Sequence, residues 1–170
     1  MFVYMTNGTY EYLASLKKKH AEQQMYLMLN PKTALLYYET EGSSIFKSGR
    51  KYEVIEAAGT LEQSGFAVMN HIPVTEEGHP IFEYRFKTHV KMIEKEPGFK
   101  VFRLLRPAAG DTYIVFTLWE KESAFLQWKE SASFAQAHEK QESLDGPSSV
   151  QKIFSGPSYL SQYTLPAEKG

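Results

Sequence analysis

Apolar residues recur in the second half of the chain with two different periods, and the change between them marks the predicted elements. Residues 66–73 alternate with a period of two, which is typical of a half-buried strand. Residues 81–93 instead place Phe82, Phe86 and Val90 on one stripe at helical spacing. The same criteria predict strands over 99–105, 112–119 and 159–165, and a helix from about residue 121. The resulting order, β-α-β-β-α-β, is that of a ferredoxin-like domain.

The first third of the chain has a comparable but incomplete order. The pattern predicts a helix over 9–19 that is capped by Thr9, and a helix over 52–58 that ends at Gly59. Strands are predicted over 2–5, 25–29, 33–39 and, as a short segment, between Gly42 and Ser48. The first third therefore reads as a partial ferredoxin-like unit, β-α-β-β-β-α.

A polar connector, Leu61 to Gly65, separates the two parts. We predict an α+β protein with a structural N-terminal unit over 1–62 and a ferredoxin-like domain over 63–170. An antiparallel sheet with helices on one face needs cover on the other. The N-terminal unit would supply that cover in a pseudo-dimeric monomer, and a second subunit would supply it in a homodimer.

The charges and the absent residue types limit the partners and sites that the sequence suggests. The chain has 19 Lys and Arg against 20 Asp and Glu, a net charge of -1, so nothing electrostatic favours nucleic acid or an anionic membrane. It has no cysteine, which excludes disulfides, thiolate metal sites and cysteine nucleophiles. Residues 1–8 lack the pattern of a signal peptide, and no apolar run approaches the roughly 18 residues of a membrane span. We therefore expect a cytoplasmic protein.

Asn70 is an unusual residue for a strand. Its neighbours on the same face of the predicted strand are Phe66, Val68 and Ile72. A carboxamide among such residues must find hydrogen bonds or cost roughly 1–3 kcal/mol. Either Asn70 lies near the strand end and binds a loop backbone, or it serves a ligand.

Two aromatic rings face one apolar space beyond the strand over 112–119. Trp128 lies on the inner face of the helix that begins near residue 121. Residues 131–133 interrupt that helix, and a second short helix follows with His138 on its apolar face. His138 is thus a candidate core histidine, general base, or metal or haem ligand.

The rest of the sequence narrows these roles. No G-x-S-x-G motif is present for a serine hydrolase. His71, His79 and His89 fall on separate elements, so no second zinc ligand stands at metal-site spacing. A single imidazole with a tryptophan and an asparagine in apolar surroundings suits haem, which needs one neutral imidazole, a dry pocket and a distal hydrogen-bond donor.

The segment from Leu118 to His138 closely resembles the antibiotic biosynthesis monooxygenase domain, in particular the IsdG-type haem-degrading monooxygenases, and the whole chain is similar to their HmoB-like members. The resemblance implies that His138 is the proximal ligand of the haem iron and that Asn70 forms hydrogen bonds with distal ligands. It also implies that Trp128 packs on the porphyrin and bends it out of plane.

The reaction that this resemblance implies is oxidative opening of haem, which is both substrate and cofactor. An external reductant reduces the iron, O2 binds to it, and the ring opens to a bilin-like product with release of iron. Arg85 and Phe86, on the helix over 81–93, would border the haem. No G-x-G-x-x-G follows a strand, so the chain has no flavin or nicotinamide fingerprint, and a separate reductase must supply the electrons.

Two other functions fit parts of the pattern. The same domain family includes cofactor-free monooxygenases that oxidise polyphenols to quinones, using Trp and Asn without haem. TRAP-type signalling proteins resemble the chain over its full length, including the segments 52–55 and 103–107. Their staphylococcal members lack the Asn and Ala-His pair that stand here as Asn70 and Ala137-His138. A non-catalytic haem-binding or signalling protein is therefore the alternative to an enzyme.

Overall fold

The computed structural model of the protein describes residues 1–46, 49–130 and 153–167. The strands of this part of the chain are β1 (Phe2–Gly8), β2 (Gln24–Leu29), β3 (Ala34–Thr40), β4 (Arg50–Ala58), β5 (Gly65–Pro73), β6 (Phe99–Pro107), β7 (Thr112–Trp119) and β8 (Tyr159–Leu165). The helices are α1 (Tyr10–Lys19), the short 3-10 helix η1 (Glu76–Gly78), α2 (His79–Ile93) and α3 (Glu122–Lys129).

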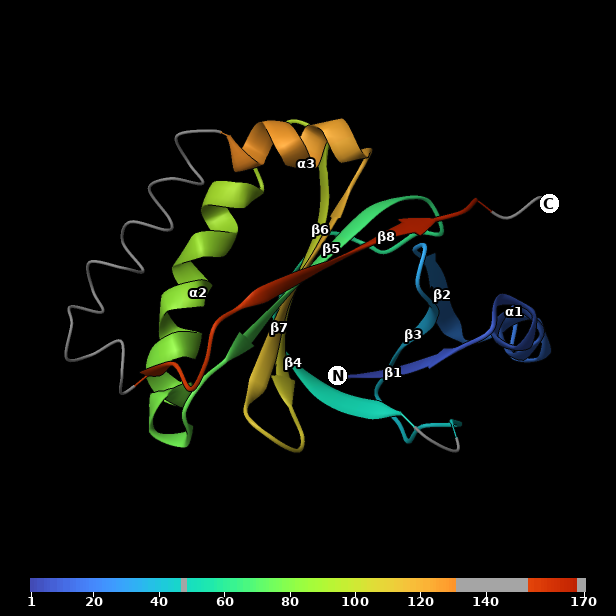
Figure 1. The fold of residues 1–170 in the computed structure, drawn as a ribbon, viewed down its shortest axis with the longest axis horizontal. Helices are drawn as coiled ribbons and strands as arrows, with labels where there is room; N and C mark the ends of the chain where they lie inside the picture. Colours follow the sequence, from blue (N-terminus) through green and yellow to red (C-terminus); the bar gives the residue numbers. More distant parts are fainter. Residues whose placement is uncertain (47–48, 131–152, 168–170) are drawn as a thin grey trace.

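The strands form one closed antiparallel barrel in the order β1-β3-β2-β8-β5-β7-β6-β4. Helices α2 and α3 lie outside the barrel against the strands of the second half, and α1 lies outside the strands of the first third (Figure 1). The predicted α+β class is confirmed, and β5-α2-β6-β7-α3-β8 follows the predicted ferredoxin-like order. No helix among the described residues is long and apolar enough to span a lipid bilayer.

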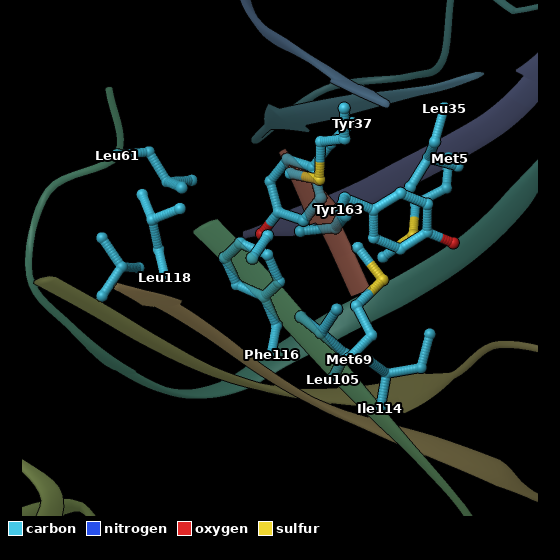
Figure 2. Close-up of a cluster of buried hydrophobic side chains, with 14 of the residues drawn as sticks. Met5, Leu35, Tyr37, Leu61, Met69, Leu105, Ile114, Phe116, Leu118 and Tyr163 are labelled. Carbon is cyan, nitrogen blue, oxygen red and sulfur yellow. The ribbon is translucent and has the colours of Figure 1, made fainter. Parts of the chain in front are cut away.

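The interior of the barrel is filled by side chains from both parts of the chain (Figure 2). Tyr37 of β3 stacks on Phe116 of β7 with ring centroids 5.2 Å apart, and both rings are fully buried. Met5, Met28 and Met69 fill the space around such rings, as flexible thioethers often do. Because the barrel is a packed core, a large ligand must bind outside it.

The structure contradicts the predicted helix over 52–58. These residues belong to β4, which pairs with β1 on one side and β6 on the other, with an irregularity between Val54 and Glu56. Tyr52 and Val54 pack into the barrel. The local pattern of this short segment is compatible with a helix or a strand, and pairing with distant strands determines that it is a strand. Gly59 does adopt a positive φ of 81°, but it follows a strand and passes close to the backbone of Lys100.

The N-terminal unit is therefore β-α-β-β-β, without the predicted closing helix. Residues 43–46 have no regular structure, and the short strand predicted there is wrong over these residues. Because β4 lies between β1 and β6, the first third supplies strands to the same barrel as the second half. The division into units 1–62 and 63–170 stays a prediction.

The side chain of Gln63 closes the weakest seam of the barrel. Strands β2 and β8 pair through Leu29 and Thr164 alone among the described residues. Beside this seam, the Gln63 Nε2 donates to the carbonyls of Leu27 (2.8 Å) and Pro166 (3.0 Å), and its Oε1 accepts from the Leu27 N–H at 2.8 Å. The carboxamide thus takes the place of a strand residue beside β2.

We expect Gln63→Ala to lower the free energy of unfolding by about 2–3 kcal/mol, since three hydrogen bonds of about 1 kcal/mol each are lost. Urea denaturation would measure this change. Gln24→Ala, at an exposed position of β2, is the matched control and should change stability by less than about 0.5 kcal/mol. Equal effects of the two variants would show that the seam does not depend on Gln63.

Candidate functional site

The alternation of β5 determines on which side of the sheet the candidate site lies. Phe66, Val68 and Ile72 join the apolar cluster between the sheet and helices α2 and α3. Met69 instead points into the barrel. Asn70 therefore points to the helix-facing side, on the face that the sequence predicted for it.

The carboxamide of Asn70 is the polar group that β5 places on this side. Its side chain is half-buried, and its cross-strand neighbours are Val115 on β7 and Leu160 on β8. It forms no side-chain hydrogen bond with the residues that the structure describes, so the expected alternative, a bond to a loop backbone, is not seen there. An amide in such a position can donate to a ligand that binds beside the sheet.

Trp128 lies on the same side of the sheet. It is half-buried on α3 and packs against Trp119 and Phe125, with ring centroids 5.5 Å and 6.2 Å away. Trp119 pairs with Phe66, four residues before Asn70 on β5. At about 3.3 Å per residue, the two ends of the site are about 13 Å apart along the strand. Asn70 and Trp128 thus lie on the same face of the sheet, toward different ends of β5.

Helix α2 supplies the wall beside this face. Phe86 is buried against Phe82, with ring centroids 4.6 Å apart, and belongs to the cluster between α2 and the sheet. Arg85, one residue earlier, is half-buried. His138 lies outside the described residues, so its predicted place opposite Asn70 stays a prediction.

A polar network holds α2 on the sheet. Glu83, buried on α2, accepts hydrogen bonds from the Arg106 Nη2 (2.6 Å) and Nε (2.8 Å) on β6 and from the Tyr113 hydroxyl on β7. Burial works to raise the pKa of Glu83, but the bonds from Arg106 and Tyr113 outweigh it and hold that pKa below its usual value. The pair stays charged at neutral pH and fixes the rotation of α2 that turns Phe86 toward the sheet.

The sequence analysis missed this network. Its members are 23 and 30 residues apart in sequence, and an ion pair between distant elements leaves no periodic signal. No group of three His, Asp or Glu side chains that could hold a metal ion occurs within the described ranges.

His71 follows Asn70 and points the other way, into the barrel mouth. Its Nε2 lies 2.9 Å from the Ser161 Oγ in a hydrogen bond, and its ring stacks on Tyr159 with centroids 4.5 Å apart. Burial, together with the nearby Arg50 guanidinium, lowers the pKa of His71 from 6.5 to about 4. The imidazole is therefore neutral at pH 7 and is not a candidate acid for the chemistry.

This depressed pKa predicts a dependence of stability on acid. Unfolded His71 takes up a proton near pH 6.5 and folded His71 only near pH 4, so its contribution to the free energy of unfolding is complete above pH 6.5 and declines as the pH falls to 4. Chemical denaturation across this window should show a shallower decline for His71→Gln than for the wild type. A decline of the same steepness would assign the effect to other groups.

Comparison with known proteins gives three informative matches. The family profile "Antibiotic biosynthesis monooxygenase" matches residues 65–140. A "Heme-degrading monooxygenase" from Listeria monocytogenes is 27% identical over 129 residues, 76% of this chain and 77% of the relative. A "Signal transduction protein TRAP" from Staphylococcus aureus is 30% identical over 132 residues, 78% of this chain and 79% of the relative.

One solved structure is similar over almost the whole length. It is described as a major regulator of staphylococcal pathogenesis, and its TM-score is 0.84 at 26% identity. The match covers 98% of this chain and 99% of that one, so the two proteins share the fold over almost their whole length.

Proposed function

Because residues 65–140 match the antibiotic biosynthesis monooxygenase family, we propose that the chain is a haem-degrading monooxygenase. It binds haem through His138 and opens the porphyrin oxidatively, using O2 and an external reductant, with release of iron. The Listeria relative bears the name of this activity.

The observation that carries the proposal is the Asn70 carboxamide, which stands in apolar surroundings and has no hydrogen-bond partner among the residues that the structure describes. A ligand that brings a hydrogen-bond acceptor to this point would offset the free-energy cost of partly burying the amide. Trp128 lies on the same side of the sheet, where its indole offers a flat surface. Since the barrel interior is filled, a molecule as large as haem would have to bind outside it, on this helix-facing side.

Each residue then has a distinct task. Haem is the substrate and supplies the iron at which O2 reacts. Asn70 would offer its Nδ2 as a hydrogen-bond donor to the O2 that reacts with haem. Trp128 would lie against the porphyrin, Phe86 would form an apolar wall that keeps water out, and Arg85 would border the haem from α2.

Titration of the apoprotein with haemin tests the proposal. We expect a saturable shift of the Soret band at one haem per chain, and its loss in His138→Ala because the iron loses its protein ligand. His20→Ala, at the end of α1, is the control and should bind as the wild type does. Ascorbate with catalase present should then make the Soret band decay. No saturable shift in the wild type would contradict the proposal.

The similarity to TRAP supports a second candidate function, that of a signalling protein. The staphylococcal relative is slightly more identical than the Listeria enzyme, at 30% against 27%. A signalling protein that senses haem would show the Soret shift but no decay under ascorbate. Oxidation of a polyphenol without haem would instead indicate a cofactor-free monooxygenase of the same family.

A further inference from the structure

The outer face of α2 carries a row of cations. Lys87, Lys91 and Lys95 are spaced by four residues, all three are exposed, and the last lies just past the end of the helix. At helical spacing this row is opposite the stripe of Phe82, Phe86 and Val90 that packs on the sheet. We name the row together with Tyr84 and Ile81 the α2 outer face.

This face combines positive charge with apolar area. Tyr84 is 74% exposed and Ile81 is 47% exposed, so both add apolar area to this face. The acidic residue within α2, Glu83, turns inward to Arg106. Glu94 and Glu96 flank Lys95 just past the helix and leave Lys87 and Lys91 as its exposed cations. The face is thus locally cationic on a chain whose net charge is only -1.

We propose that the α2 outer face docks an acidic electron-carrier protein, which reduces haem bound on the other side of the helix. This inference rests on the proposed function, because haem degradation consumes electrons and the sequence has no flavin or nicotinamide fingerprint. In the docked complex the carrier loses one electron and the ferric iron of haem gains it to become ferrous. No bond or proton needs to move in this step.

The geometry suits such a partner. Electron-transfer complexes are small and transient, and complementary charge steers their encounter. The face lies on the same helix as Phe86, so only the thickness of one helix, about 10–12 Å, separates the docked surface from the proposed haem site. The other run of lysines, Lys17 to Lys19, ends α1 on the far side of the barrel (Figure 1).

Charge reversal tests the proposal. Haem-loaded Lys87→Glu/Lys91→Glu/Lys95→Glu protein would be supplied with an acidic plant-type [2Fe–2S] ferredoxin, its reductase and NADPH, and the decay of the Soret band followed. We expect a rate at least about tenfold lower than that of the wild type at low ionic strength, and a weaker dependence on salt. Decay driven by ascorbate, a small molecule that needs no docking surface, should be unchanged.

A matched variant controls for total charge. Lys18→Glu/Lys19→Glu/Lys32→Glu makes the same change at exposed sites of the N-terminal unit and should keep the ferredoxin-driven rate. Equal losses in both triple variants, or no loss in the α2 variant, would overturn the docking site while ascorbate-driven decay leaves the proposed function intact. Absence of ascorbate-driven decay in the wild type would remove the proposed function and this inference together.

Discussion

Asn70→Ala is expected to bind haemin as tightly as the wild type, within about a factor of two, and to degrade it roughly 100-fold more slowly. In the proposed function the amide contacts oxygen and not the porphyrin, so its removal should leave the affinity for haemin almost unchanged. A hydrogen bond to a group that becomes charged during reaction is worth about 1.5–3 kcal/mol, which corresponds to a rate change of that order. Soret titration gives the affinity, and decay under ascorbate with catalase gives the rate.

The chain provides a close control for this variant. Gln162 carries the same carboxamide group on the same face of the sheet, on β8 opposite Val68, and its side chain is exposed. Gln162→Ala should retain both affinity and rate. Unchanged degradation in Asn70→Ala would remove Asn70 from the mechanism, and loss of haem binding would make it a residue of the binding site alone.

The elements that the sequence predicted well are those that local pattern determines. The strand over 159–165 has the predicted bounds, and α2 differs from its prediction only at its first turn, because their apolar periods are regular. The orientation of Asn70 also followed from alternation along one strand. Residues 52–58 were predicted wrongly, because a run of that length forms a strand only when β1 and β6 lie beside it.

What the sequence could not provide is contact between distant positions. Closure of the barrel depends on the position of β4 between β1 and β6, and no local pattern within β4 predicts these two neighbours. The anchoring of α2 by Glu83 and Arg106 has the same origin. The sequence therefore predicted the side of the sheet that single residues such as Asn70 face, whereas it could not predict the network that holds α2 on the sheet.

A second ion pair, inside the barrel, also joins residues that are distant in sequence, so the local pattern did not predict it. Arg103 of β6 and Glu39 of β3 are 6% and 7% exposed, and the Arg103 Nε lies 3.4 Å from the Glu39 Oε1. Arg103 also donates to the carbonyls of Ala58 (3.0 Å) and Gly59 (3.1 Å), and Glu39 accepts from the Tyr37 hydroxyl at 3.0 Å. The pair thus connects three strands and the turn after β4.

Arg103→Met is expected to lower the free energy of unfolding by about 3–5 kcal/mol, since it leaves the Glu39 carboxylate buried without its cation. Lys100→Met on the same strand is the control: its partner Glu62 is exposed, and an exposed pair contributes only about 0–1 kcal/mol. Denaturation in guanidinium chloride would compare the two.

A double variant separates the charge from the packing. Glu39→Leu/Arg103→Met removes both charges at similar volume, so it should regain most of the stability that Arg103→Met loses. Because the pair lies inside the barrel, on the opposite side of the sheet from Asn70, folded Arg103→Met protein should still bind haemin with wild-type affinity. A loss of Arg103→Met stability no larger than that of Lys100→Met would show that water reaches this end of the barrel and screens the pair.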